Sequence, residues 1–228
     1  MKRLLAAVLV FIPLFALGHV SITSGNGIAN TTQKITLGVG HGCEGADTIS
    51  VKTTIPTGVT NVRAMPSDFG KPTVTMNTAG VPTAVTWERQ PADLIPVDTN
   101  YYELVFRAKL PDAPFTILYF PTEQTCPLPD GGTAVSLWTN TTGMTPGPGE
   151  PEAAPSVAIV PAHKPGWNKM TVPVAVPNLA AFFSDAQIVW RGTEAYSPNA
   201  SVTELIGGTA GVSALSSLAA GDQIWVKY

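Results

Sequence analysis

The feature that most limits the fold of this sequence is a series of short runs rich in β-branched and aromatic residues. Each run is closed by glycine, proline, asparagine or aspartate. Between residue 19 and about residue 140, the runs fall at 34–39, 48–54, 73–76, 84–88, 101–108, 115–120 and 134–139. Short apolar runs between turn-forming residues are typical of strands. Their spacing predicts a mainly β protein with an antiparallel immunoglobulin-like β-sandwich of roughly seven strands.

Alternation within two of the runs indicates which side chains face the core. Ile49, Val51 and Thr53 share one side of a strand. Tyr102, Leu104 and Phe106 do the same in a second run. Because successive side chains of a strand point to opposite faces, we expect one face of each strand to be buried.

A stretch rich in proline and glycine divides the chain. Residues 145–155 contain PGPGEPEAAP, a composition that disfavours both helix and sheet and favours a linker. The sandwich is therefore expected over residues 19–144, and a small α+β unit over residues 156–228. In that unit we expect strands at 168–176, 186–191 and 223–228, a short helix at 178–184 with Leu179, Phe182 and Phe183 inward, and a helical turn or two at 213–220.

The first 18 residues have the pattern of a cleaved signal peptide. Lys2 and Arg3 precede an apolar run at 4–15, and Ala16-Leu17-Gly18 follows, with small residues at the positions that signal peptidase reads. Cleavage after Gly18 would make His19 the first residue of a periplasmic or secreted protein. The run is shorter than the roughly 20 apolar residues that a membrane-spanning helix needs, and no later segment meets that length.

Charge and cysteine content narrow the possible functions. The formal net charge is -3 and only 13% of residues are charged, which argues against binding to nucleic acid or an anionic membrane. The only two cysteines, Cys43 and Cys126, predict one disulfide in an exported protein. A thiolate metal site is the alternative.

A histidine at the first position can hold a metal ion by itself. Its α-amine and its imidazole Nδ1 can close on one ion, so a single residue acts as a chelate. Copper(II) suits these donors, because it favours nitrogen ligands in a tetragonal geometry with oxygen donors alongside. His19 is therefore a candidate copper(II) ligand that processing would create.

Residues 19–139 resemble the YcnI-like copper-binding domain family of exported bacterial proteins. The likeness is carried by His19 and Val20 at the expected mature start, and by six further motifs in matching order and spacing. These are HGCEG at 41–45, IPTGVTNV at 55–62, VTWER at 85–89, YYELVFRAKLPD at 101–112, LYFPTEQTC at 118–126 and VSLW at 135–138.

The resemblance implies a β-sandwich with a monohistidine brace that holds copper(II). The ligands would be His19 and Glu103, with Trp138 beside the site and no catalytic activity. Such a protein would carry or buffer copper, and its partner would be another periplasmic copper protein or a membrane copper transporter. Two features depart from the family: PLPDGG at 127–132 lengthens the turn before Trp138, and residues beyond the linker resemble extensions of some proteobacterial members.

Other readings of the sequence remain open. His41 is expected to be a loop residue hydrogen-bonded near the disulfide, and His163 a residue of a solvent-exposed loop, although either one is a possible further copper ligand. Exposed aromatic side chains favour a carbohydrate-binding module without metal as the alternative function, and the residues that would form it are Trp167, Trp190, Trp225 and Tyr196. A copper-dependent oxidase that cleaves polysaccharides would need a second histidine in the brace.

Overall fold

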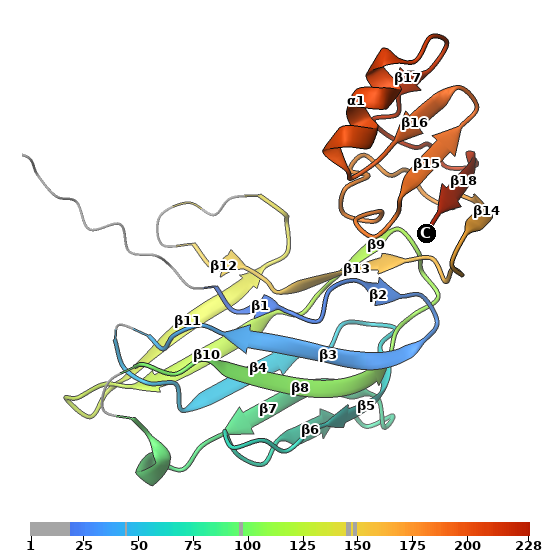
Figure 1. Ribbon diagram of the computed structural model, residues 1–228. Coiled ribbons are helices and arrows are strands. Elements are labelled where there is room, and N and C mark those ends of the chain that lie inside the picture. Colours follow the sequence, from blue (N-terminus) through green and yellow to red (C-terminus); the bar gives the residue numbers. More distant parts are fainter. Residues whose placement is uncertain (1–18, 44, 96–97, 145–146, 148–149) are drawn as a thin grey trace, which may run out of the picture.

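The computed structural model confirms a mainly β protein with largely antiparallel sheets (Figure 1). It describes residues 19–43, 45–95, 98–144, 147 and 150–228. The expected signal peptide at 1–18 lies outside the described residues. In the part of the chain that is described, no helix is long and apolar enough to cross a membrane.

One sheet of the sandwich has four strands, in the order β1 (Ser21–Ile22), β3 (Thr32–Val39), β8 (Tyr102–Lys109) and β5 (Thr60–Ala64). All three pairings are antiparallel. Along β8, Leu104, Phe106 and Ala108 are completely buried, while Glu103 and Arg107 are exposed. The alternation predicted for this strand is therefore confirmed.

The facing sheet has six strands. Their order is β12 (Glu152–Ala153), β11 (Thr133–Asn140), β10 (Thr122–Pro127), β4 (Ser50–Thr54), β7 (Pro82–Glu88) and β6 (Thr73–Met76). Val51 and Thr53 of β4 are buried as predicted. The core between the two sheets centres on Trp87, Phe106 and Phe120, whose rings pack at 5.8 to 6.4 Å. A 3-10 turn, Pro91–Asp93, follows β7.

A third sheet joins the two ends of the sandwich sequence. It contains β2 (Gly27–Ile28), β13 (Ser156–Val160) and β9 (Thr116–Tyr119). The central strand β13 follows the predicted linker, and it pairs in parallel with β2 and antiparallel with β9. Residues 156–160 thus belong to the sandwich by their hydrogen bonds, although they come after the Pro- and Gly-rich stretch.

The C-terminal unit is a five-stranded sheet with one helix. The strand order is β14 (Trp167–Thr171), β18 (Gln223–Lys227), β15 (Ile188–Arg191), β16 (Glu194–Tyr196) and β17 (Ser213–Ala214). The helix is α1, Ala200–Gly208. Asn199 begins it by accepting a hydrogen bond from the Ser201 amide, as N-cap residues do.

The prediction of helices at 178–184 and 213–220 in this unit is wrong. Residues 178–184 form tight turns in which the amides of Phe182 and Phe183 donate to the Leu179 carbonyl oxygen. The inward direction expected for these three side chains is right, because all are buried. Residues 213–220 contain the short strand β17 and an isolated bridge between Leu218 and Val176.

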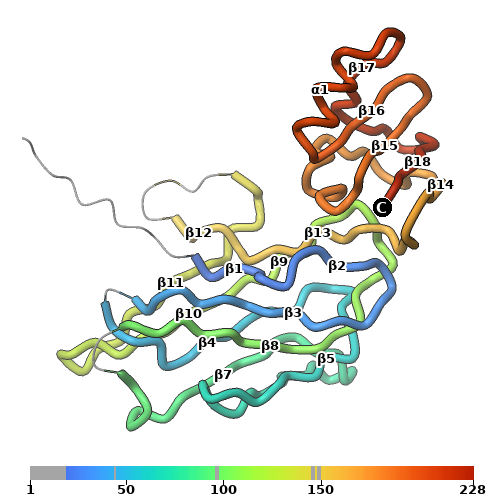
Figure 2. The backbone as a smooth tube through the Cα atoms, viewed as in Figure 1, coloured from blue at the N-terminus to red at the C-terminus, as the bar shows by residue number. Residues whose placement is uncertain are grey.

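The C-terminal unit packs against the end of the sandwich that carries β2, β9 and β13 (Figure 2). Phe115, which precedes β9, packs edge to face against Phe182 and at a tilt against Phe183, with ring centroids 5.8 and 5.6 Å away. Val160 of β13 belongs to the same apolar cluster. Across the contact, the Asn26 amide donates to the Ala181 carbonyl at 3.3 Å.

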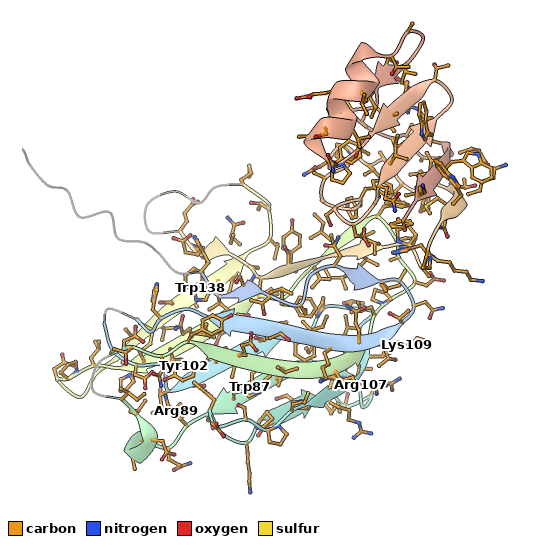
Figure 3. All side chains as sticks on the ribbon, in the orientation of Figure 1. Trp87, Arg89, Tyr102, Arg107, Lys109 and Trp138 are labelled. Carbon is orange, nitrogen blue, oxygen red and sulfur yellow. A yellow bond between two sulfur atoms is a disulfide. The ribbon has the colours of Figure 1, made fainter. Side chains whose placement is uncertain are left out.

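A buried ion pair closes the opposite end of the sandwich (Figure 3). The Arg89 guanidinium donates to the Asp47 carboxylate at 2.7 Å, and the Tyr102 hydroxyl donates to the same carboxylate at 2.7 Å. The side chains of Arg89 and Asp47 are only 7% and 2% exposed. Burial, reinforced by the hydrogen bond to Asp47, raises the pKa of Tyr102, so its hydroxyl stays protonated and donates.

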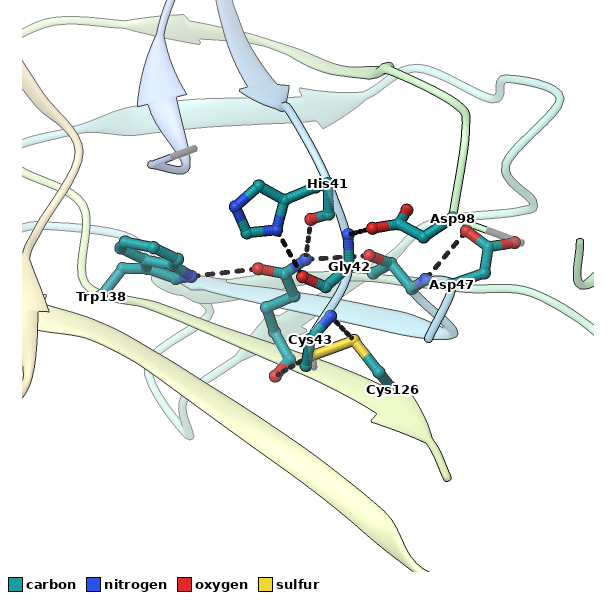
Figure 4. Close-up of a disulfide and its surroundings, with 9 residues drawn as sticks. His41, Gly42, Cys43, Asp47, Asp98, Cys126 and Trp138 are labelled. Atoms are coloured by element: carbon teal, nitrogen blue, oxygen red, sulfur yellow. Dashed lines mark hydrogen bonds between the residues drawn. A yellow bond between two sulfur atoms is a disulfide. The ribbon is translucent and has the colours of Figure 1, made fainter. Parts of the chain in front are cut away.

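The disulfide predicted between Cys43 and Cys126 is confirmed (Figure 4). Its Cα atoms are 5.6 Å apart, and the bridge ties the loop after β3 to the end of β10. Both cysteines form this disulfide, which rules out the alternative of a thiolate metal site.

Candidate functional site

His19 lies directly before β1, at the edge of the four-stranded sheet. Its exposed imidazole meets the Trp138 indole edge to face, with ring centroids 5.3 Å apart and planes at 70°. The next residue, Val20, is buried in the sandwich core, and Ser21 and Ile22 pair with β3. The segment that carries His19 is therefore held in place by both burial and strand pairing.

The Trp138 side chain is fixed by a buried amide. Its indole N–H donates to the Gln124 side-chain oxygen at 3.1 Å, and the Gln124 NH₂ donates to the His41 carbonyl at 2.6 Å and to the Thr48 hydroxyl at 2.8 Å. Gln124 is 1% exposed, and its bonds to Trp138 and Thr48 are buried while the bond to His41 is partly buried. A fully satisfied buried network of this kind keeps the indole in one orientation.

A depression of about 410 Å³ opens beside Trp138. Its walls include His41, Gly42, Glu150 and Glu152. Figure 4 shows that the His41 ring and the Trp138 indole lie near one another at this place. A Cβ atom at Gly42 would lie 1.7 Å from the Ala46 carbonyl oxygen, so the loop bearing His41 closes only with glycine there.

His41 is a loop residue with hydrogen bonds near the disulfide, as expected. Its Nδ1 lies 2.5 Å from the Gly42 carbonyl oxygen, and its own carbonyl receives the Gln124 amide. The Gly42 amide donates to the Asp98 carboxylate. These bonds hold the histidine at the rim of the depression.

His163 is less exposed than we expected. It lies in a loop, but its side chain is only 16% exposed because its ring stacks on Tyr228 at 3.5 Å and its Nε2 lies 3.6 Å from the Asp185 carboxylate. The prediction of solvent exposure is therefore wrong for the His163 side chain. It belongs to the C-terminal unit, away from Trp138.

Glu103 lies on the outer face of the four-stranded sheet. It pairs with Gly38 of β3, which in turn pairs with Ser21 of β1, so Ser21 and Glu103 lie in one row. Two strand spacings separate them, about 10 Å. The Tyr101 side chain lies over Gly38 in this row, since a Cβ atom at Gly38 would be 2.2 Å from the Tyr101 hydroxyl oxygen.

The structure thus brings His19 to Trp138 and leaves Glu103 at the same end of the sheet, two strands away. Within the described residues, no hydrogen bond or ion pair joins His19 to Glu103. Another carboxylate lies near the indole. Glu152 of β12 pairs with Trp138 of β11 across the two strands, and it also lines the depression.

In the full-length chain the nitrogen of His19 is part of a peptide bond. The described residues contain no group of three or more histidine, cysteine, aspartate or glutamate side chains arranged to hold a metal ion. A site made by one residue through its amine and imidazole does not need such a group. The donors that the structure offers around Trp138 are nitrogen and carboxylate oxygen, a set that suits copper(II).

A family model for a domain of unknown function, DUF1775, matches residues 19–160. The match covers more than half of the chain. The chain belongs to the DUF1775 family. The family region begins at His19 and ends with β13, so it includes the strand that follows the Pro- and Gly-rich stretch.

One solved structure supports the immunoglobulin-like fold of the DUF1775 region. An uncharacterised protein from Nocardia farcinica with an immunoglobulin-like fold is 25% identical, and the alignment covers 62% of this chain and 97% of that one with a TM-score of 0.50. A cohesin, ScaC from Acetivibrio cellulolyticus, aligns at 16% identity over 61% of this chain and 96% of that one, with a TM-score of 0.34. None of the curated proteins matches the chain.

Proposed function

We propose that this DUF1775 protein is exported, binds copper(II) through His19 once residues 1–18 are removed, and carries or buffers the ion outside the cytoplasm. The α-amine and the imidazole of His19 would supply two nitrogen donors. A carboxylate would supply an oxygen donor, and Trp138 would flank the ion. The role is binding and transfer rather than catalysis, and the receiving partner is a periplasmic copper protein or a membrane copper transporter.

The observation that carries the proposal is the contact between His19 and Trp138. An indole fixed by Gln124 holds an exposed imidazole at one edge of the sandwich, beside a depression with further polar groups. Val20 and β1 anchor the backbone next to the histidine, so a new amine formed at residue 19 would keep its position at this edge of the sandwich. Preorganised donors bind an ion more tightly than donors that must first be ordered.

The open side of such a site favours transfer. A copper ion held by two nitrogens of one residue and a single carboxylate keeps coordination positions that a partner's ligands can occupy. The exposed imidazole leaves room for a partner to approach. This is the physical reason to assign the protein to copper delivery or buffering rather than to a structural metal site.

Titration of the processed protein with copper(II) tests the proposal. We expect binding of one ion per protein, an EPR spectrum with nitrogen hyperfine structure, and quenching of tryptophan fluorescence, because copper(II) at His19 would lie beside the Trp138 ring. Trp138→Phe is the matched control: it should keep the EPR signal and lose most of the quenching. Absence of stoichiometric binding by the native protein would contradict the proposal.

The same titration identifies the carboxylate donor. Glu103 is the acid implied by the family resemblance, and Glu152 is the acid that shares the depression with Trp138. We expect Glu103→Gln to weaken copper(II) binding at least about tenfold, since loss of even outer-shell partners costs 10- to 100-fold. Equal binding by Glu103→Gln and the native protein, with weaker binding by Glu152→Gln, would move the oxygen donor to β12.

A further inference from the structure

The outer face of the C-terminal sheet combines three tryptophans with two lysines. We call it the tryptophan face. It is formed by the outward positions of three neighbouring strands: Trp167, Lys169 and Thr171 of β14, Gln223, Trp225 and Lys227 of β18, and Ile188 and Trp190 of β15. Trp167 and Trp225 are 53% and 49% exposed, although tryptophan is usually well buried.

Strand register sets the tryptophans in a line. Trp225 is the direct cross-strand partner of Trp190, and Trp167 is its diagonal neighbour, because Trp167 pairs with Lys227 two residues further along β18. Cross-strand and diagonal spacings together give a row about 12 Å long. The three rings line one shallow hollow with Gly192. Tyr196, a candidate for the aromatic platform of the alternative function, packs against the inner apolar cluster.

Positive charge accompanies the row of rings. Lys169 pairs directly with Trp225, and its ammonium lies 5.9 Å from the centroid of that indole ring. Lys227 occupies the position opposite Trp167. None of the outward residues of β14, β18 and β15 named above is acidic. Nearby, Arg191 is already paired with Glu194 and Asp222, so these carboxylates do not neutralise the two lysines.

We propose that the tryptophan face binds an acidic polysaccharide, a chain of sugar rings that carry carboxylates. Sugar rings have apolar faces that stack on exposed aromatic rings, and a row of three indoles matches an extended chain. The lysine ammonium groups pair with the carboxylates, while Thr171 and Gln223 offer hydrogen bonds to hydroxyl groups. This function is separate from copper binding, because the face lies in the C-terminal unit.

The chemistry of the face favours a glycan over a lipid surface. Proteins that insert into a membrane interface bury an apolar face among the acyl chains. Here two lysines, a threonine and a glutamine are interleaved with the rings across the sheet, which places polar groups where acyl chains would have to lie. Carboxylated sugars can stack on the tryptophan rings and pair with the lysine ammonium groups at the same time.

A matched pair of polymers tests the proposal. The full protein in its processed form, kept free of copper, is titrated with polygalacturonate and with the same polymer fully methyl-esterified, and binding is followed by tryptophan fluorescence and affinity electrophoresis. We expect the acid form to bind at least about tenfold more tightly, because esterification removes the charge that the lysines recognise. Equal binding of both polymers would overturn the role of the lysines.

Variants of the face complete the test. Trp225→Ala should weaken binding of both polymers at least about tenfold, as loss of an aromatic anchor does. Lys169→Gln combined with Lys227→Gln should abolish the preference for the acid form. Leu205→Ala, at an exposed site of α1, is the control and should bind like the native protein. If Trp225→Ala unfolds, Trp167→Ala replaces it. Native binding by the tryptophan variants, or binding to phosphatidylglycerol vesicles but to neither polymer, would overturn the proposal.

Discussion

A processed protein with one additional alanine before His19 is expected to bind copper(II) on the order of 100-fold more weakly than the native form. The insertion moves the α-amine to a residue without an imidazole and turns the nitrogen of His19 into a peptide nitrogen. The two donors then no longer belong to one residue. Removal of supporting groups from metal sites lowers metal affinity about 10- to 100-fold, and we expect the upper end of this range here.

Copper titration and EPR of the native and alanine-extended proteins measure this effect. Ser21→Ala, with the native start, is the matched control because it changes the same segment and leaves the amine in place. Val20 remains anchored in the core in both variants, so thermal unfolding should not change. An unchanged spectrum and affinity for the extended protein would show that the amine of His19 is not a ligand.

Asp47→Ala is expected to have the largest effect on stability. The carboxylate of Asp47 accepts hydrogen bonds from Arg89, Tyr102 and the Ile95 amide inside the sandwich. Its removal leaves the guanidinium buried without a counterion, a change that costs about 3–5 kcal/mol. For a protein of this length, that loss corresponds to a fall in Tm of about 10 °C.

Urea unfolding of the purified variants measures the difference. Lys52→Ala provides the contrast, because the Lys52 to Glu123 ion pair joins side chains that are 50% and 47% exposed and should contribute no more than about 1 kcal/mol. Replacing Asp47 by leucine and Arg89 by methionine together should recover much of the loss, since no charge is then buried alone. If Asp47→Ala unfolds at the same urea concentration as the native protein, the ion pair does not stabilise the sandwich.

Much of the sandwich was predictable from residue pattern, because its strands alternate in hydrophobicity and end at turn-forming residues. All seven predicted runs contain a strand. The sandwich strands outside these runs are β1, β2, β5, β10, β12 and β13. Of these, β5 and β10 have weak patterns. In β10 the buried positions are Thr122, Gln124 and Cys126, so the inward face is polar or carries the disulfide.

The C-terminal unit was harder to predict, because its local sequence preferences conflict with its packing. Residues 178–184 have helical spacing, yet Phe182 and Phe183 reach Phe115 from tight turns. The helix that does form, α1, has a single buried residue, Ile206, and two glycines at its end. A helix with so small an apolar face has almost no periodic signal.

The candidate site was likewise predictable only in part from the sequence. The sequence and its resemblance pointed to His19 and Trp138, and the structure puts them in contact. Gln124 was missed, because its role depends on the pairing of β10 with β11 and on a loop 83 residues earlier. A long polar residue at an inward strand position was the available signal.

The position of β13 has a consequence for any attempt to separate the two halves of the protein. A fragment that stops before residue 156 would leave β2 and β9 without the strand that pairs with both of them. Unpaired strand edges invite association between molecules. A fragment that begins at residue 156 would keep Val160 but lose Phe115 from its apolar cluster, and its β13 would lose both neighbouring strands. Cutting the chain at its Pro- and Gly-rich stretch would therefore produce two fragments that tend to associate through unpaired strand edges, rather than two independent folding units.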